Sequence, residues 1–187
     1  MKPRHSTSLL LVWRVAEVEA KRLNAPEIEP LHLLIGLCKA VNLDLPALVS
    51  KDTPDRDDIL EELLREVRRL RTIFRTAQVN PTPLRRKLRG TPLDRRFQME
   101  ESETLHRTAA AKKVFADAEH FAQLAGAVVY PAHLHYAVLL GDDTRRDDTF
   151  KDLGIDKPRF QEVAKREVVF QREDGAAAMS KPKTRWN

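Results

Sequence analysis

The stretch Glu29–Leu37 reads EPLHLLIGL, and Tyr130–Leu139 reads YPAHLHYAVL. Both carry the signature Pro-x-His-Leu, formed by Pro30, His32 and Leu33 in the first stretch and by Pro131, His133 and Leu134 in the second. Proline suits the first position of a helix, because its missing amide would have no partner there and its φ is already set. Each stretch is therefore predicted to begin a short apolar helix, and the two signatures mark either two sites or two copies of one structural unit.

An apolar stripe with helical spacing precedes each signature. The first stripe follows the candidate N-cap residues 6–8 and consists of Leu9, Val12, Trp13, Ala16, Ala20 and Leu23. The same positions displaced by 102 residues are again apolar: Ala111, Val114, Phe115, Ala118, Ala122 and Ala125. The two signature histidines are 101 residues apart, so the second loop is one residue shorter. An internal duplication is the economical explanation.

Each copy continues with a short third helix and a longer fourth helix, so that residues 6–76 and 102–172 are predicted to form four helices each. Neither copy shows the alternation of a strand, and no sheet is predicted. Two similar apolar faces that cannot be buried alone can bury each other. We therefore expect an all-α fold in which residues 1–187 form one domain of two four-helix repeats with pseudo-twofold symmetry.

Residues 77–101 are predicted to be a basic linker between the repeats. Asn80-Pro81-Thr82-Pro83 and Gly90-Thr91-Pro92 should interrupt any continuous helix there. Residues 173–187 have little apolar content to bury and are expected to form a mobile tail.

The composition excludes several classes of protein. Apolar residues make up 42% of the chain and charged residues 33%, which is neither a disordered nor a membrane composition. No apolar run reaches the length of a membrane span, and the run before Arg14 is too short for a signal-peptide core. The single cysteine, Cys38, forms no intramolecular disulfide and fits a reducing compartment. A cytoplasmic location is the natural prediction.

Positive charge is concentrated in the middle of the chain. Between Arg65 and Arg96 there are eleven basic residues and only two acidic ones, a net charge of +9 in a chain of net charge +5. Such clustering can attract an anionic partner, although a solvated face would show the same pattern. The candidate contacts for an anionic partner are Arg68, Arg69, Arg71, Arg75, Arg85, Arg86, Lys87 and Arg89.

The histidines and the cysteine favour structural roles. His32 and His133 stand at the third position of their helices, where an imidazole can pack and bond free end groups. His133 and His135 are two residues apart, unlike the pair in the zinc motif H-E-x-x-H. Cys38 lies in an apolar run with no nucleophile signature around it. No catalytic, cofactor-binding or metal-binding residue is predicted.

The order of these motifs resembles the Clp N-terminal domain, a duplicated helical module at the front of Clp-type AAA+ unfoldases. The resemblance rests on Ala-Lys-Arg-Leu at 20–23, Ile28, the run Pro-x-His-Leu-Leu-Ile-Gly-Leu at 30–37, and Leu-Gly-Ile-Asp at 153–156. It covers residues 6–76 and 102–170. It implies a non-enzymatic module that recruits substrates or adaptors to a Clp ATPase, or that regulates a Clp protease.

Two departures from that family qualify the resemblance. The family usually carries a glutamate directly before each signature histidine, which contributes to a phosphoarginine pocket, whereas this chain has Leu31 and Ala132 there. Without those carboxylates to pair with a guanidinium, phosphoarginine is not the expected ligand. None of the six glycines begins a G-x-x-x-x-G-K-[ST] loop, so we expect a stand-alone module without the ATPase that follows this domain in the family.

The resemblance implies protein partners, namely a Clp ATPase or protease subunit, an adaptor or a client protein. The alternative is a nucleic-acid-binding protein that uses the arginine-rich segment 65–96, since arginine releases counterions from phosphates. An enzyme of unrecognised chemistry is the third and weakest hypothesis.

Overall fold

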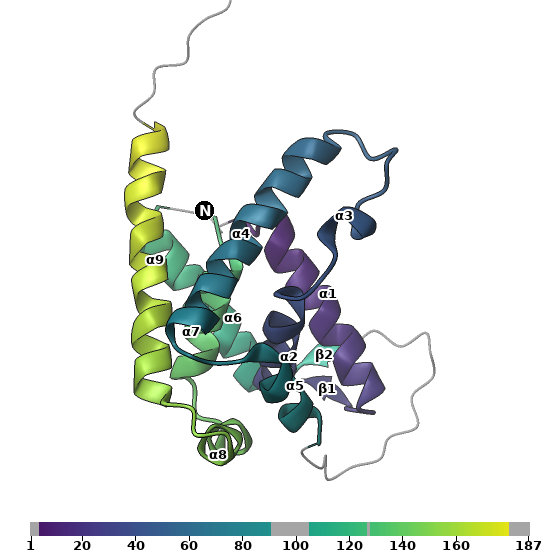
Figure 1. Ribbon diagram of the computed structural model, residues 1–187, viewed down its shortest axis with the longest axis vertical. Coiled ribbons are helices and arrows are strands. Elements are labelled where there is room, and N and C mark those ends of the chain that lie inside the picture. Colours follow the sequence, from purple (N-terminus) through teal and green to yellow (C-terminus); the bar gives the residue numbers. More distant parts are fainter. Residues whose placement is uncertain (1–3, 91–104, 127, 180–187) are drawn as a thin grey trace, which may run out of the picture.

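The computed structural model describes residues 4–90, 105–126 and 128–179. Within these ranges the chain forms nine helices: α1 Thr7–Arg22, α2 Pro30–Ala40, α3 Leu45–Leu48, α4 Arg56–Thr76, α5 Pro81–Gly90, α6 Ala109–Leu124, α7 Pro131–Leu140, α8 Thr144–Asp152 and α9 Lys157–Met179. Two strands of two residues each, β1 Glu27–Ile28 and β2 His106–Arg107, complete the fold (Figure 1). The prediction of an all-α fold is confirmed. The strands are too short to leave any alternation in the sequence.

Helices α1 and α6 are equivalent elements, and both their ends are displaced by 102 residues. Ser6 caps α1 by accepting the Leu9 amide at 3.1 Å, and Thr108 caps α6 by accepting the Ala111 amide at the same distance. Trp13 and its counterpart Phe115 meet edge to face, with ring centroids 5.6 Å apart. Equivalent side chains therefore contact each other across the pseudo-twofold relation.

The two repeats are interlocked through their backbones. β1 pairs in parallel with β2, and His5 forms the corresponding bridge with Val129. The Ser6 amide donates to Val129 O, and the Thr108 amide donates to Ile28 O, each at 3.1 Å. In both cases the segment before the first helix of one repeat bonds to the loop of the other repeat. Each repeat thus supplies hydrogen-bond partners that the other lacks.

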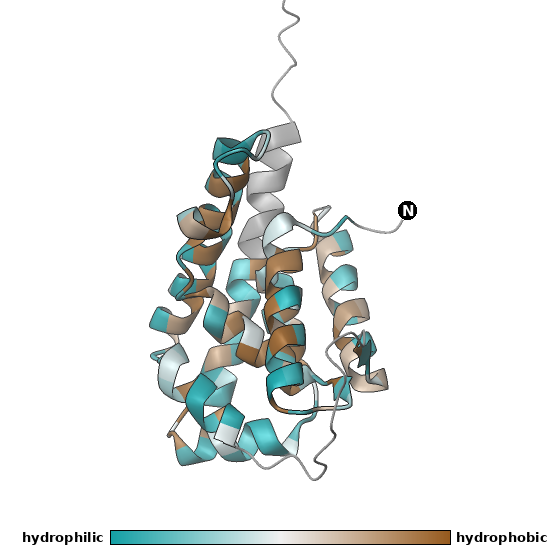
Figure 2. Ribbon diagram, turned by 90° about the vertical axis from the view of Figure 1, so that its right-hand side faces the viewer, coloured by the Kyte–Doolittle hydropathy of each residue, from teal (hydrophilic) through white to brown (hydrophobic). Residues whose placement is uncertain are grey.

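The apolar side chains of the helices meet in one large core to which both repeats contribute, including α2, α7 and the ends of α4, α5 and α9. Polar and apolar residues alternate along the same helices, as expected for amphipathic helices (Figure 2). A smaller apolar cluster, Leu45, Leu60, Leu63 and Val67, joins α3 to α4. The fourth helices depart from the symmetry, because α4 contacts α1, α3, α7 and α9, whereas α9 contacts mainly α7 and α4.

The segment between the repeats differs from the expected interrupted linker. Residues 81–90 form helix α5, which buries Leu84 and Leu88 and packs against α2 and α8. Pro81 and Pro83 lie in its first turn, where no amide is needed, so they begin a helix instead of interrupting one. The remainder of the linker, including Arg95 and Arg96, lies outside the described residues.

The end of the chain also differs from the expectation. Helix α9 continues to Met179, past the predicted boundary of the second repeat at residue 172. The run Ala176–Ala178 favours this extension, since alanine has the highest helix propensity. The rest of the predicted tail, with Trp186, lies outside the described residues.

Gly36 allows α2 to approach α1 closely. A Cβ at this position would lie 2.8 Å from Val12 O and 3.2 Å from the Ala16 Cβ. Because the nearest atom belongs to a helix backbone, we expect Gly36→Ala to lower the free energy of unfolding by about 2 kcal/mol. The measurement is urea unfolding followed by circular dichroism.

The equivalent position in the second repeat provides the control for Gly36. Ala137 is fully buried there, so α7 already accommodates a methyl group against its neighbours. Ala137→Gly is expected to cost about 1–2 kcal/mol, from helix propensity and from the loss of one buried methyl group. Wild-type stability of Gly36→Ala would contradict the close approach of α1 and α2.

Candidate functional site

The two signature histidines stabilise the first turns of α2 and α7. Pro30 and Pro131 each occupy the first turn, and the Nδ1 atoms of His32 and His133 accept the amides of Glu29 and Tyr130, both at 3.0 Å. Since Nδ1 accepts, the proton of each neutral ring lies on Nε2. Burial lowers the pKa of both histidines to about 4. They are neutral groups that cap helices in the core.

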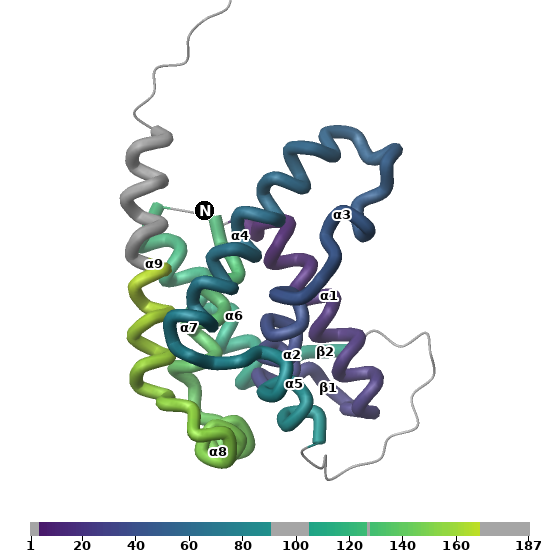
Figure 3. Tube along the Cα trace, in the orientation of Figure 1, coloured from purple at the N-terminus to yellow at the C-terminus, as the bar shows by residue number. Residues whose placement is uncertain are grey.

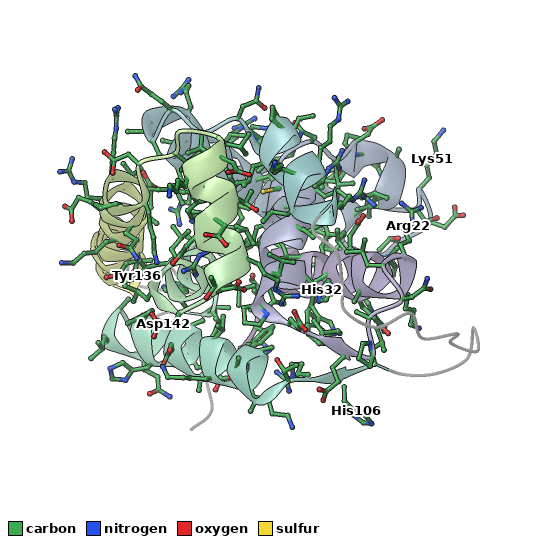
Figure 4. All side chains as sticks on the ribbon, turned by 90° about the horizontal axis from the view of Figure 1, so that it is seen from below. Arg22, His32, Lys51, His106, Tyr136 and Asp142 are labelled. Carbon is green, nitrogen blue, oxygen red and sulfur yellow. The ribbon has the colours of Figure 1, made fainter. Side chains whose placement is uncertain are left out.

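His135 lies deeper in the core than the two signature histidines. Its ring centroid is 4.8 Å from that of Phe160 and 5.3 Å from that of Phe74, and neither ring nitrogen has a hydrogen-bond partner among the described residues. Burial lowers its pKa to about 3. Figure 4 shows His32 in the interior of the bundle, whereas His106 and Lys51 lie at its periphery.

The described residues contain no group of three or more histidine, cysteine, aspartate or glutamate side chains arranged to hold a metal ion. Cys38 is fully buried, and burial raises the pKa of its thiol well above the ordinary range. Among the described residues, no helix combines the length and the apolar character that crossing a membrane requires.

Leu31 and Ala132, which directly precede the signature histidines, are core residues with only 1% of their surface exposed. Leu33 and Leu134, the last residues of the two signatures, are also fully buried. The side chains directly before the signature histidines therefore offer no polar atom to a ligand.

A cavity of about 370 Å³ lies where the first turns of α2, α6 and α8 meet. Its lining includes Glu29, Pro30, Thr108, Ala110, Asp143 and Arg145. The carboxylate of Glu29 pairs with the guanidinium of Arg145 across this cavity. Asp143 and Thr108 cap α8 and α6. The Glu29–Arg145 cavity thus lies between both repeats and holds one ion pair whose side chains are about one-third exposed.

The pseudo-equivalent region near the first turns of α7 and α1 is covered by α4. The Thr7 amide donates to the Glu62 carboxylate at 3.2 Å. Glu66 is buried and lies 3.5 Å from both Arg65 and Arg69. Burial raises the pKa of Glu66, although Arg69 and Arg65 oppose the rise, and burial together with Glu66 raises the pKa of Tyr130. Helix α4 thus supplies the carboxylate that contacts the first turn of α1 in this region.

The eight basic side chains proposed as anion contacts do not act as one group. Four of them hold internal contacts: Arg69 with Glu66, Arg71 with Val41 O, Lys87 with Asp152, and Arg89 with Glu19. Arg85 is half-buried. Arg68, Arg75 and Arg86 are exposed. Apart from Arg85, these basic residues therefore fall into two groups in the structure: those that hold contacts within the chain and those that are exposed to solvent.

Glu19 forms a buried ion-pair contact that was not predicted from the sequence. It is 1% exposed and binds Arg89 of α5 at 2.7 Å and Lys39 of α2 at 3.3 Å. Burial acts to raise the pKa of Glu19, but the hydrogen bonds from Arg89 and Lys39 outweigh it and hold the pKa below its ordinary value. Arg145 was also missed, because its partner Glu29 is more than one hundred positions away in the sequence.

Comparisons with known proteins place the fold. No protein-family model matches the chain, and no curated protein matches it by sequence. Solved structures do match. The N-terminal domain of Hsp104 from Candida albicans superposes with a TM-score of 0.60 at 16% identity, covering 86% of this chain and 89% of that domain.

Two further structures agree with this match. A protein from a structural study of a malarial protein secretion system has a TM-score of 0.59 at 16% identity and covers 88% of this chain and 95% of its own. The N-terminal domain of the chaperone ClpD from Arabidopsis thaliana has a TM-score of 0.57 at 16% identity, covering 86% and 92%. The predicted resemblance is confirmed at the level of the fold: the chain has the fold of the Clp N-terminal domain.

Proposed function

We propose that the protein is a non-enzymatic protein-binding module that serves a Clp chaperone or protease as an adaptor, a substrate-binding unit or a regulatory accessory. The observation that supports the proposal is the Glu29–Arg145 cavity, which opens where the two repeats of a Clp N-terminal-like fold meet. Binding sites occur preferentially at such junctions between structural units.

The cavity suits a polar segment of a protein partner. Glu29 and Arg145 are each about one-third exposed, so their ion pair is partly solvated. Replacing it by a pair with an incoming charged side chain therefore costs little free energy. A carboxylate of the partner would pair with Arg145, and an ammonium or guanidinium group would pair with Glu29. Phosphoarginine is not proposed as the ligand, because Leu31 and Ala132 supply no carboxylate.

No catalytic step is proposed. The signature histidines are neutral capping groups, and Cys38 is a buried thiol that stays protonated. The single cysteine also supports a cytoplasmic location. Nucleic-acid binding through segment 65–96 has less support, because half of its candidate contacts already hold partners within the chain.

The proposal predicts recovery of Clp components by the immobilised protein. From lysate at mild salt, the wild type is expected to retain Clp ATPase or protease subunits or their clients, identified by mass spectrometry. Arg145→Glu places two carboxylates together in the cavity and is expected to reduce this recovery about tenfold, the equivalent of about 1.4 kcal/mol.

Lys112→Glu is the matched control for the charge change, since Lys112 is exposed on α6 and does not line the cavity. It should retain the same partners as the wild type, and circular dichroism should show that both variants are folded. Absence of every Clp component from the wild-type sample would contradict the proposed function.

A further inference from the structure

One face of α4 is exposed along most of the helix and carries two blocks of opposite charge. Acidic side chains come first, and arginines follow, in the order Asp57, Asp58, Glu61, Arg65, Arg68 and Arg75. All six are exposed, and the side chain of Asp57 is 97% accessible. The opposite face buries Leu63, Val67 and Leu70. Figure 3 traces α4 from the middle of the molecule to its upper edge.

The spacing of these residues keeps the charges in one row. Residues three or four positions apart lie on the same side of a helix, so Glu61, Arg65, Arg68 and Arg75 project in similar directions. We define these four residues with Asp57 and Asp58 as the α4 charge face. The helix dipole favours acidic residues in the first turn and basic residues in the last, but it acts weakly on the middle of the helix. It therefore does not account for the order of Glu61, Arg65 and Arg68.

We infer that the α4 charge face is the contact surface for a second copy of this chain, with the two α4 helices antiparallel. A twofold axis beside Leu64 brings Glu61 of each copy opposite Arg68 of the other. The same arrangement brings Asp57 and Asp58 opposite the turn that contains Arg71 and Arg75. Every attraction occurs twice, because a twofold contact uses the same surface on both copies.

A second copy matches the face better than a polyanion does. A nucleic acid lying along α4 would be attracted to Arg65, Arg68 and Arg75 but repelled by the three acidic side chains of the first turns. An antiparallel copy reverses the order of the charges, so that the acidic side chains meet arginines of the other copy, while Arg65 lies beside the axis opposite Leu64. Leu64, which is half-buried, lies beside the axis and adds apolar contact. The inference does not depend on the proposed function.

Contacts made mainly of exposed ion pairs are weak and are screened by salt. The full chain is therefore expected to approach twice the monomer mass at high protein concentration in about 20 mM salt, and to return to the monomer mass in about 0.5 M salt. Sedimentation equilibrium measures this mass directly.

Charge exchange tests the pairing. Glu61→Arg and Arg68→Glu should each weaken dimerisation at least tenfold, because each places like charges opposite each other. The double variant E61R/R68E should dimerise again, as should an equal mixture of the two single variants, because opposite charges then face each other across the contact. Lys112→Glu should dimerise like the wild type.

A chain that stays monomeric at low salt overturns the inference, and so does failure of the double variant and of the mixture to recover the dimer. If the protein is monomeric but binds a fluorescent single-stranded oligonucleotide in an Arg68-dependent way, the face contacts a polyanion and the inference fails.

Discussion

At pH 4 the protein is expected to lose most of the stability that it has at pH 7. The cause is three buried histidines that are neutral in the fold, His32, His133 and His135, whose pKa values are lowered from about 6.5 to about 4, 4 and 3. In the unfolded chain these rings take up protons near pH 6.5, whereas the folded chain takes them up only near or below pH 4. The unfolded state therefore binds more protons across this window, and acidification favours it.

The magnitude of the acid effect follows from the lowered pKa values. At about 1.4 kcal/mol per pH unit, each of the three histidines contributes on the order of 3–5 kcal/mol of destabilisation once the pH falls to its folded pKa. Burial raises the pKa of Glu66 and Glu167, which offsets part of the loss because both carboxyls gain protons in the fold. Single domains have total stabilities of about 5–15 kcal/mol, so the three histidines together suffice to unfold the protein.

Urea unfolding at pH 7, 6, 5 and 4 checks this expectation, with a midpoint that falls steadily below pH 6.5. His135→Leu should flatten the decline, and it should raise stability at pH 7 because it removes a buried ring without hydrogen-bond partners. His106→Gln, at an exposed position, should leave the profile unchanged. A midpoint that stays constant from pH 7 to pH 4.5 would show that the three rings are not buried as described.

The duplicated core of the fold was predictable because its signals are local. The stripe from Leu9 to Leu23 and its copy 102 residues later specify equivalent amphipathic helices, and Pro-x-His-Leu specifies where the next helix begins. Helix α5 was not predicted, because Pro81 and Pro83 indicate a break and a helix start equally well. Its burial depends on α2 and α8, which the local sequence does not reveal.

The candidate site was much less predictable than the fold. Glu29 lies in the stretch that marks the first repeat, but nothing in its neighbourhood points to Arg145, which only the interlocking of the repeats brings near. Likewise, Arg89 looks like one of many surface charges until α5 places it beside the buried Glu19. Contacts between distant residues leave no periodic pattern in one sequence, so charge counts alone could not separate internal ion pairs from exposed arginines.

Replacing Arg146 by methionine is expected to lower the free energy of unfolding by about 3–5 kcal/mol. Arg146 belongs to α8 and is 1% exposed. It donates to Val138 O at 2.5 Å and to Gly141 O at 2.7 Å, where the end of α7 leaves carbonyls without intrahelical partners. It also donates to Asp147 at 2.8 Å, and Asp147 accepts from Lys157 of α9 at 2.7 Å.

In the first repeat, a different arginine donates to a carbonyl at the end of the equivalent helix. This recurrence indicates that the carbonyls at the ends of α2 and α7 need a side-chain donor. Arg71 of α4 donates to Val41 O at the end of α2, at 2.9 Å. Methionine at position 146 would lose the guanidinium that lies 5.9 Å from the Phe150 ring centroid, and it would leave the carbonyls of Val138 and Gly141 without this donor. Arg146→Lys should lose less, about 2 kcal/mol, because one ammonium keeps the charge but cannot reproduce the planar fork.

Urea unfolding at pH 7 measures these losses, with Arg166→Met as the matched control. Arg166 is 67% exposed on α9 and, among the described residues, pairs with Glu162 one turn earlier, so its replacement should change stability by less than about 0.5 kcal/mol. The expected order of stability is therefore wild type and Arg166→Met, then Arg146→Lys, then Arg146→Met. If Arg146→Met instead matched the wild type, the end of α7 would be satisfied by other donors, and Arg146 would not be the group that joins α7 to α8.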